Sequence, residues 1–407
     1  MTLTLAMPHR LSVHRLGPTA SLALLASLIV SFLASSSAPT PLYAVYQAEW
    51  GFSPITTTVI FGVYAVAVLV ALLTFGKISD HIGRRPVLFA ALATQTVAMF
   101  VFASATDVST LLIARVVQGI ATGAAAAAIG AAMLDIDGRR GAVANSVAPG
   151  VGTGSGALIS ALVVQYLPSP THLIYLLLVA VFALQAIALI AMPETVTAKP
   201  GALASMTPEI KLPRAVRGSV TIAAPVLFAV WALAGFYASL GPVVLRNMVH
   251  SRSAVYGGLP LFVLAGSAAL AVLALRNAPT RQVMLLGVVA LIIGVAITLA
   301  AINASSATGF FVGSVIAGIG FGSGFQGGIR LVMPFVEAHE RAGVLSLLYV
   351  VSYLGLGVPA VIGGYLVVHA GGLLTTAREY GIAVIVLATI ALVALVARRP
   401  AAESVAE

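Results

Sequence analysis

A short polar segment, GKISDHIGRRPVL, places one carboxylate beside two guanidinium groups between two long apolar runs. Its spacing is G-x-x-x-D-x-x-G-R-R, formed by Gly76, Asp80, Gly83, Arg84 and Arg85. Glycine permits tight turns and close helix approach, so Asp80 is free to pair with an arginine or with the positive N-terminal end of a facing helix. We therefore expect an ion-pairing site in a turn between two helices.

A second polar pattern, RVVQGIATG, lies inside an apolar run at residues 115–123. Arg115, Gln118 and Thr122 recur at helical spacing and share one helix face. An arginine within a membrane costs about 2.5 to 3.5 kcal/mol on insertion scales, so we expect this face to line a translocation path. The alternative is that Arg115 extends its side chain to the outer interface.

Aromatic and amide side chains in other apolar runs are further candidates for a translocation path. They are Tyr43, Tyr237, Gln326, Tyr349 and Tyr353. Because most aromatic residues in membrane helices serve packing or interfacial anchoring, each of them alone also fits a purely structural role.

The elements that hold these residues must be membrane helices. The 407-residue chain is 60% hydrophobic and only 8% charged, and its mean hydropathy is +1.08. Apolar runs of about 20 residues, each long enough to cross the bilayer, recur along its length, and the runs lack the two-residue alternation of barrel strands. We predict an all-α membrane protein with twelve spans at residues 19–46, 54–75, 87–105, 109–133, 141–166, 171–192, 218–245, 253–276, 281–302, 308–334, 342–369 and 378–397.

The basic residues of this chain, whose net charge is +9, predict its orientation. With a cytoplasmic N-terminus, the cytoplasmic segments hold Arg10, Arg15, Lys77, Arg84, Arg85, Arg139, Arg140, Lys199, Lys211, Arg214, Arg217, Arg276, Arg281, Arg341, Arg398 and Arg399. Only Arg246, Arg252 and Arg378 fall outside, so the positive-inside rule places both termini in the cytoplasm. The charges are spread over separate segments, which argues against a nucleic-acid partner. A bacterial inner membrane suits these short basic loops.

An internal repeat divides the spans six and six. Gly119 and Gly123 match Gly318 and Gly322 at an offset of 199, while Pro41 and Pro242 are 201 apart. Between the halves lies the proline-rich, basic stretch 193–217. We predict a six-helix bundle at 1–192, a cytoplasmic linker at 193–217 and a second six-helix bundle at 218–407. Duplicated units of this kind form transporters whose site lies near the bilayer midplane.

The segment at Gly76, Asp80, Gly83, Arg84 and Arg85 resembles the signature loop of the major facilitator superfamily in spacing, span position and side. The resemblance implies that this cluster latches the two halves at the cytoplasmic face and opens as the transporter turns inward. It also implies that Arg115 lies in the translocation path, where members of the family often use this arginine for proton coupling. The resemblance implies no cofactor. APGVGTGSGALIS, at residues 148–160, resembles the antiporter signature of drug exporters, except that its second glycine-proline step is missing.

Glycines in the same spans predict close helix packing. The candidates are Gly119, Gly123, Gly150, Gly154, Gly318 and Gly322.

Acidic residues are absent from the span centres. Asp107 and Glu379 are expected in outer loops, so Arg115 has no acidic partner in its span, and the path should prefer neutral or anionic substrates over cations. The chain has no cysteine, and so no thiolate metal site. Metalloprotease, phosphate-loop and nucleophile-elbow motifs are also absent, so we expect neither an enzyme nor a metal site.

The sequence therefore predicts a monomeric secondary transporter that works by alternating access in the lipid bilayer. Its substrate is expected to be a small molecule, and export of lipophilic or weakly acidic compounds is the favoured interpretation. Import or facilitated passage of a small polar metabolite, such as a sugar or an organic acid, is the first alternative. A membrane sensor or scaffold without transport is the second, and proton coupling stays open.

Overall fold

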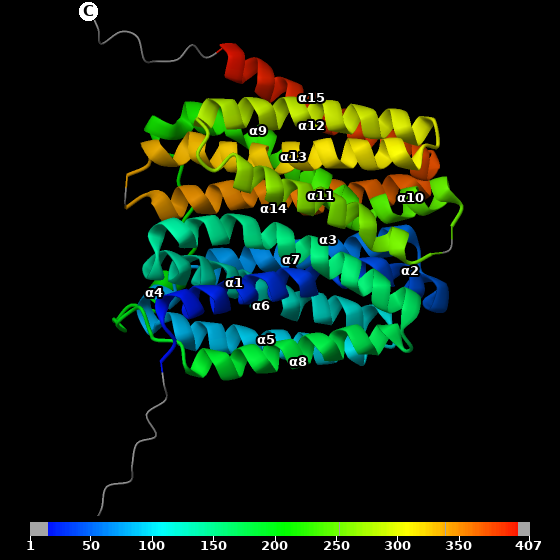
Figure 1. The fold of residues 1–407 in the computed structure, drawn as a ribbon. Coiled ribbons are helices and arrows are strands. Elements are labelled where there is room, and N and C mark those ends of the chain that lie inside the picture. The colour runs from blue at the N-terminus through cyan, green and yellow to red at the C-terminus, as the bar shows by residue number, and fades with distance from the viewer. Residues whose placement is uncertain (1–14, 252, 338, 398–407) are drawn as a thin grey trace, which may run out of the picture.

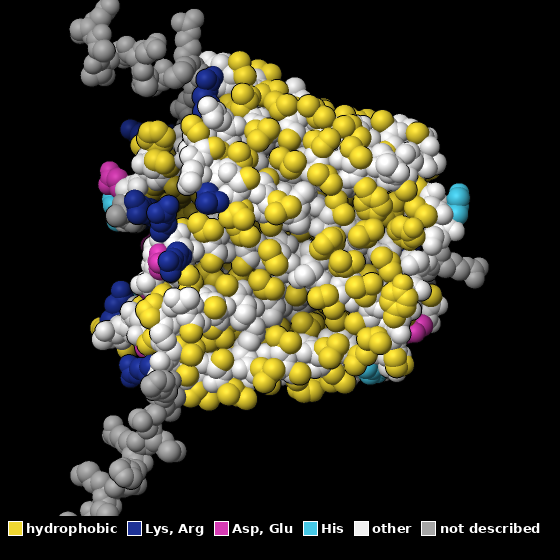
Figure 2. Space-filling model, viewed as in Figure 1, with side chains coloured by type: hydrophobic (Ala, Val, Ile, Leu, Met, Phe, Trp, Pro, Cys, Tyr) yellow, Lys and Arg dark blue, Asp and Glu magenta, His cyan; other side chains and the backbone are white. Residues whose placement is uncertain are grey.

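The computed structural model describes residues 15–251, 253–337 and 339–397, and it contains no strand within these ranges. Twelve of its helical segments are long and apolar enough to cross a membrane, which confirms the predicted fold class and number of spans. Exposed hydrophobic side chains cover the visible sides of the molecule, as expected for a surface in contact with lipid tails (Figure 2).

The first half of the chain forms α1 to α8, which lie together in the lower part of Figure 1. Their bounds are α1 Pro18–Ser37, α2 Pro39–Trp50, α3 Pro54–Phe75, α4 Ser79–Ile82, α5 Arg84–Ala103, α6 Val108–Ile136, α7 Gly138–Tyr166 and α8 Pro170–Ile190. One hydrophobic core lies wholly within this half and includes Leu28, Phe32 and Phe182.

The second half forms α9 to α15, which lie in the upper part of Figure 1. Two short 3-10 turns, η1 Ala204–Met206 and η2 Arg214–Val216, precede it. The helices are α9 Arg217–Ser239, α10 Gly241–Val249, α11 Val255–Ala274, α12 Thr280–Asn303, α13 Ala307–Val332, α14 Arg341–His369 and α15 Gly372–Ala397, with the 3-10 turn η3 Met333–Phe335 after α13. A second core belongs mainly to this half and takes Phe61, Ala65 and Ala157 from the first.

The first span of each half is broken at the same place. The first span divides at Ala38, between α1 and α2, and the seventh divides at Leu240, between α9 and α10. Pro39 and Pro41 follow the first break and Pro242 follows the second. Proline has no N–H, so it leaves carbonyl groups of the preceding turn without their helical donor. These breaks make main-chain acceptors available inside each half.

Two pairs of helices join the halves: α7 packs against α11, and α3 packs against α14 (Figure 1). The contact between α3 and α14 is close because Gly62 lies against Val361, and a Cβ atom at Gly62 would come within 2.8 Å of that side chain. The halves therefore meet along two helix pairs that small residues hold close together.

The linker also contacts both halves. The Lys199 N–H donates to the His81 carbonyl over 2.8 Å, and the Lys211 N–H donates to the Gly343 carbonyl over 3.2 Å. The domain boundary at 193–217 stays a prediction.

Two details of the sequence prediction need comment. Arg378 and Glu379 were expected in an outer loop, but α15 begins six residues earlier, at Gly372, and both side chains are exposed within its first turns. Four arginines counted in the predicted orientation lie outside the described residues: Arg10, Arg398 and Arg399, placed in the cytoplasm, and Arg252, placed outside.

Candidate functional site

The signature loop is a tight turn followed by a helix whose N-cap residue, Gly83, has no side chain to cap it. Gly83 has φ of +100°, a conformation that L side chains rarely adopt, and α5 begins at the next residue. A Cβ atom at Gly83 would also come within 2.8 Å of the Glu194 carboxylate. Glycine is therefore required here by both the backbone and the neighbouring carboxylate.

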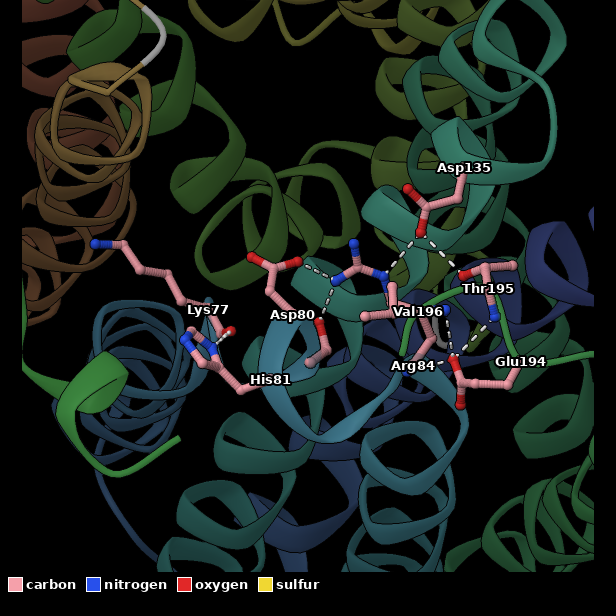
Figure 3. Close-up of polar contacts among 9 residues, drawn as sticks. Lys77, Asp80, His81, Arg84, Asp135, Glu194, Thr195 and Val196 are labelled. Carbon is pink, nitrogen blue, oxygen red and sulfur yellow. Dashed lines mark hydrogen bonds and ion pairs between the residues drawn. The ribbon is translucent and has the colours of Figure 1, made fainter. Parts of the chain in front are cut away.

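Arg84 is the centre of an ion-pair network (Figure 3). Its guanidinium donates to the Asp80 carboxylate, to Ser79 Oγ over 2.8 Å, and through Nε to Asp135 Oδ2 over 3.0 Å. The Arg84 side chain is only 7% exposed, whereas those of Asp80 and Asp135 are 45% and 31% exposed. A buried guanidinium is thus held between two half-exposed carboxylates, one from its own loop and one from the end of α6.

Glu194, at the start of the linker, closes the loop from beyond α8. Its carboxylate accepts from the backbone N–H groups of Arg84, over 2.8 Å, and Arg85, over 2.9 Å, which are the first two residues of α5. Acceptors at a helix N-terminus satisfy free N–H groups and the positive end of the helix dipole. Thr195 adds a hydrogen bond from Oγ1 to Asp135 Oδ2 over 2.9 Å.

All these partners belong to the first half of the chain or to the first residues of the linker. The Asp80 carboxylate pairs with Arg84 of its own loop, and the loop reaches the linker through Lys77, whose Nζ lies 2.6 Å from Glu209 Oε2. In this conformation the cluster is therefore bonded internally, and a latch between Asp80 and the second half stays a prediction.

The second site begins at the break between α1 and α2. Pro39 cannot donate to the Ser35 carbonyl as a helical residue would, and Gln118 Nε2 donates to that carbonyl instead, over 3.0 Å. Arg115 Nη1 donates to the neighbouring Ser36 carbonyl over 2.9 Å. Side chains of α6 thus replace donors near the broken turn of α1.

Arg115 has no exposed surface, and neutral groups satisfy its donors. Nε and Nη2 donate to Tyr43 Oη over 2.9 and 2.6 Å, and Nη1 donates to Gln118 Oε1 over 2.6 Å. The guanidinium carbon also lies 5.2 Å from the centre of the Tyr64 ring, within the range of a cation–π contact. The Arg115 side chain does not reach the outer interface. The structure therefore does not show the alternative in which this arginine extends outward.

The other predicted path residues lie apart from one another. Thr122 is buried on α6, one turn beyond Gln118. Tyr237 Oη lies 2.7 Å from Ser314 Oγ inside the second half, and Gln326 Nε2 donates to the Val272 carbonyl of α11 over 3.4 Å. Tyr353 of α14 contributes to an aromatic cluster, and Tyr349 lies one turn before it, half-buried.

The aromatic cluster surrounds Trp231 of α9. The Trp231 ring centre lies 5.1 Å from that of Tyr353, 5.7 Å from Phe325 and 6.2 Å from Phe321. Trp231 Nε1 is buried without a hydrogen-bond partner among the described residues. This cluster offers flat apolar surface and one free hydrogen-bond donor. The phenol of Tyr353 is its only ionisable side chain.

Comparison with known proteins identifies the family. Residues 23–279, more than half of the chain, match the family model of the Major Facilitator Superfamily. The chain belongs to this superfamily. It is therefore a membrane transporter, which agrees with the resemblance of the signature loop.

Among solved structures, the chain is similar to a single-site mutant of the nucleoside transporter NupG. The TM-score is 0.72 at 13% sequence identity, over 93% of this chain and 100% of that one. This likeness shows the Major Facilitator Superfamily fold alone. No curated protein matches the sequence.

Glycines of this transporter lie at two kinds of contact. Gly119 and Gly123 of α6 face α3, and Gly318 and Gly322 of α13 face α11, inside their own halves. Gly150 and Gly154 of α7 face α11 across the two halves, where their Cβ atoms would lie 2.9 and 3.3 Å from main-chain oxygens. The glycine-rich face of α7 is thus part of the contact between the halves.

Sequence reasoning missed several residues of these sites. Asp135 and Glu194 were given no role in the sequence analysis, although both follow predicted spans on the side where the signature loop was expected. Ser36 contributes through its carbonyl, which sequence reasoning identifies only through the prolines that follow. No group of His, Asp and Glu that could hold a metal ion occurs in the described ranges.

Proposed function

We propose that this transporter is a secondary active carrier that works by alternating access and exports small lipophilic or weakly acidic compounds. The observation that carries the proposal is that Arg115 is fully buried and that Tyr43, Gln118 and the Ser36 carbonyl, all uncharged, are its partners.

A buried arginine without a carboxylate keeps its positive charge. Its donors are held by a phenol, an amide and a carbonyl. A substrate carboxylate would outcompete each of them, because it adds the attraction of opposite charges and can accept two parallel N–H bonds from the guanidinium. A cationic substrate would instead be repelled. The site therefore favours anionic or hydrogen-bond-accepting compounds over cations.

The aromatic cluster on the other half supports the lipophilic part of the proposal. Trp231, Phe321, Phe325 and Tyr353 offer stacking surface, and the Trp231 N–H is a free donor. A planar weak acid would find charge on the first half and apolar surface on the second. Export, as opposed to import, rests on the resemblance of residues 148–160 to the antiporter signature.

Alternating access is supported by the contacts between the halves. They meet mainly through α3 with α14 and α7 with α11, so a rocking motion would slide or open these two pairs while the first core, which lies wholly within its half, stays intact. We propose that the chain acts as a monomer.

We also propose a cytoplasmic location for both termini in a bacterial inner membrane. On the visible face, Lys and Arg gather at the end of the molecule that carries α4, while the opposite end shows none (Figure 2). The positive-inside rule assigns such an end to the cytoplasm.

The test is transport in proteoliposomes with imposed pH and sodium gradients. A weak aromatic acid, its neutral amide and a quaternary ammonium compound would be compared in wild type, Arg115→Lys and Arg115→Ala. We expect the acid to be transported in preference to the cation and this preference to disappear in Arg115→Ala. Arg115→Lys should restore it only in part, because lysine lacks the planar fork.

A tyrosine pair controls for damage to the fold. Tyr43→Phe removes the oxygen that accepts two bonds from Arg115, whereas Tyr175→Phe removes a buried hydroxyl whose partner is Tyr46, in the same half. Only Tyr43→Phe should change the preference for the acid. Equal selectivity in wild type and Arg115→Ala would contradict the proposal.

A further inference from the structure

The second half has its own corner at the basic end of the molecule, formed by the α11–α12 loop and the end of α13. Arg330 of α13 donates through Nη2 to the Arg276 carbonyl over 2.8 Å. Its Nη1 lies 3.4 Å from the Leu275 carbonyl oxygen and 3.5 Å from that of Ala278. We call this region the counterpart corner. Its arginine is held in place by neutral main-chain groups.

A cavity of about 420 Å³ opens beside this arginine. It is lined by Thr280, Ile329, Arg330, Met333, Pro334 and Arg341. Thr280 is the first residue of α12, and no side chain caps that helix. Free N–H groups of a long helix therefore point toward the same space as two guanidinium groups.

Among the described residues, no carboxylate pairs with the arginines of the cavity, Arg330 and Arg341. The acids closest in sequence are Glu337, which lies 3.4 Å from His339, and Glu340, which pairs with no base in the described ranges. The cavity thus has two uncompensated arginines.

The rest of the lining is apolar. Ile329, Met333 and Pro334 supply it, and the neighbouring Phe335 is 60% exposed, as an aromatic anchor at a membrane interface would be. The α13 helix also ends at the end of the molecule where Lys and Arg gather, beside sides that are rich in hydrophobic side chains (Figures 1 and 2). A ligand here would place an anionic group and an apolar group side by side.

We propose that this cavity binds an anionic phospholipid, with the lipid phosphate between Arg330, Arg341 and the start of α12. The glycerol and upper acyl chain would lie on Ile329, Met333 and Pro334. Basic pockets between helices at a membrane surface bind lipid head groups in this way. A free phosphate shares the charge chemistry but makes no use of the apolar lining, so we commit to the lipid.

The experiment uses the purified full-length transporter in detergent and measures its unfolding temperature as lipid is added. Phosphatidylglycerol, phosphatidylcholine and inorganic phosphate are the three probes. We expect phosphatidylglycerol to stabilise the wild type at concentrations at which the other two have no effect. Since each basic residue near a membrane surface contributes about 1 kcal/mol, or about five-fold in affinity, Arg330→Gln with Arg341→Gln should weaken the response on the order of 25-fold.

Two further variants keep the test decisive. Arg139→Gln with Arg140→Gln removes the same charge from the exposed start of α7, in the other half, and should leave the lipid response unchanged. Arg341→Gln alone removes an exposed side chain without hydrogen bonds to the described protein, so it should fold normally and still weaken the response about five-fold. The proposal is overturned if phosphatidylcholine or inorganic phosphate stabilises equally, if both double variants lose the response equally, or if Arg341→Gln has no effect.

Discussion

The two corners at the basic end occupy corresponding places in the two halves but distribute their charges differently. In the signature corner, formed by Ser79, Asp80, Arg84, Asp135 and Glu194, the arginine comes from the loop side and the end of α6 supplies a carboxylate. In the counterpart corner the arginine comes from α13 and the loop supplies only carbonyl groups.

The offset of the predicted internal repeat shows which residue differs between the two corners. Asp135 of α6 and Pro334 are 199 residues apart, the same offset that relates Gly119 to Gly318. Where the first half has the carboxylate that receives Arg84, the second half has a proline in the wall of the cavity. One corner therefore satisfies its charge internally, whereas the other leaves positive charge for an external anion.

The largest expected effect comes from removing the central arginine of each corner. Arg84→Ala leaves Asp80 and Asp135 without their cation and should destabilise the protein by about 2 to 3 kcal/mol. Arg330→Ala removes hydrogen bonds to carbonyl groups that water can replace, so about 1 kcal/mol is expected. Thermal unfolding of both variants in the same detergent measures the difference, and Arg84→Lys should recover part of the loss. Equal destabilisation by the two alanine variants would show that the two corners do not differ as described.

A smaller effect is expected from giving the second corner the acid of the first. Pro334→Asp places a carboxylate in the wall that Arg330 and Arg341 share, at a position corresponding to Asp135. The new carboxylate should pair with an arginine and weaken the response to phosphatidylglycerol about ten-fold, which corresponds to about 1.4 kcal/mol. Pro334→Asn is the matched control without charge and should keep the response. Identical behaviour of the two variants would indicate that charge at this position is irrelevant to lipid binding.

Much of this architecture could be predicted from the sequence. The spans are long, uniform and apolar, so their number and type depend on composition alone, and the spacing of Gly76, Asp80 and Gly83 was specific enough to indicate the family. The breaks at Ala38 and Leu240 were less visible, because each lies inside one long predicted span, at 19–46 and 218–245. Their positions are given by the prolines that follow each break.

The partners of the charged residues were harder to predict, because they depend on contacts between distant segments. Glu194 meets Arg84 across 110 residues, and Arg115 meets Tyr43 across 72. Arg330, near the end of α13, donates to main-chain carbonyl groups of a loop of its own half, more than 50 residues away in the sequence. Residue type and helix position restrict such partners, while the choice among them is made only when the helices pack.

The smallest expected effect concerns the linker, which reaches both corners by different chemistry. At the signature corner, Glu209 accepts from Lys77 over 2.6 Å, and this hydrogen bond lowers the pKa of the Glu209 carboxyl below its ordinary value of 4.5. At the other end, the Lys211 N–H donates to the Gly343 carbonyl, two residues after Arg341, and neither group titrates. Acid should therefore release only the first contact.

The sign of this pH dependence follows from the lowered pKa. A carboxylate that is stabilised in the folded state contributes fully above its unfolded pKa, and the contribution is lost as pH falls through the folded value. The cysteine-free chain allows spin labels on Ile82→Cys and Thr207→Cys, with a second pair on Ile210→Cys and Ala342→Cys. The first distance should stay constant from neutral pH to about pH 5 and broaden below about pH 4, and the second should not change. Glu209→Gln has no carboxylate to titrate, so its first distance should be independent of pH. If that distance broadens with acid as in the wild type, another group releases the linker.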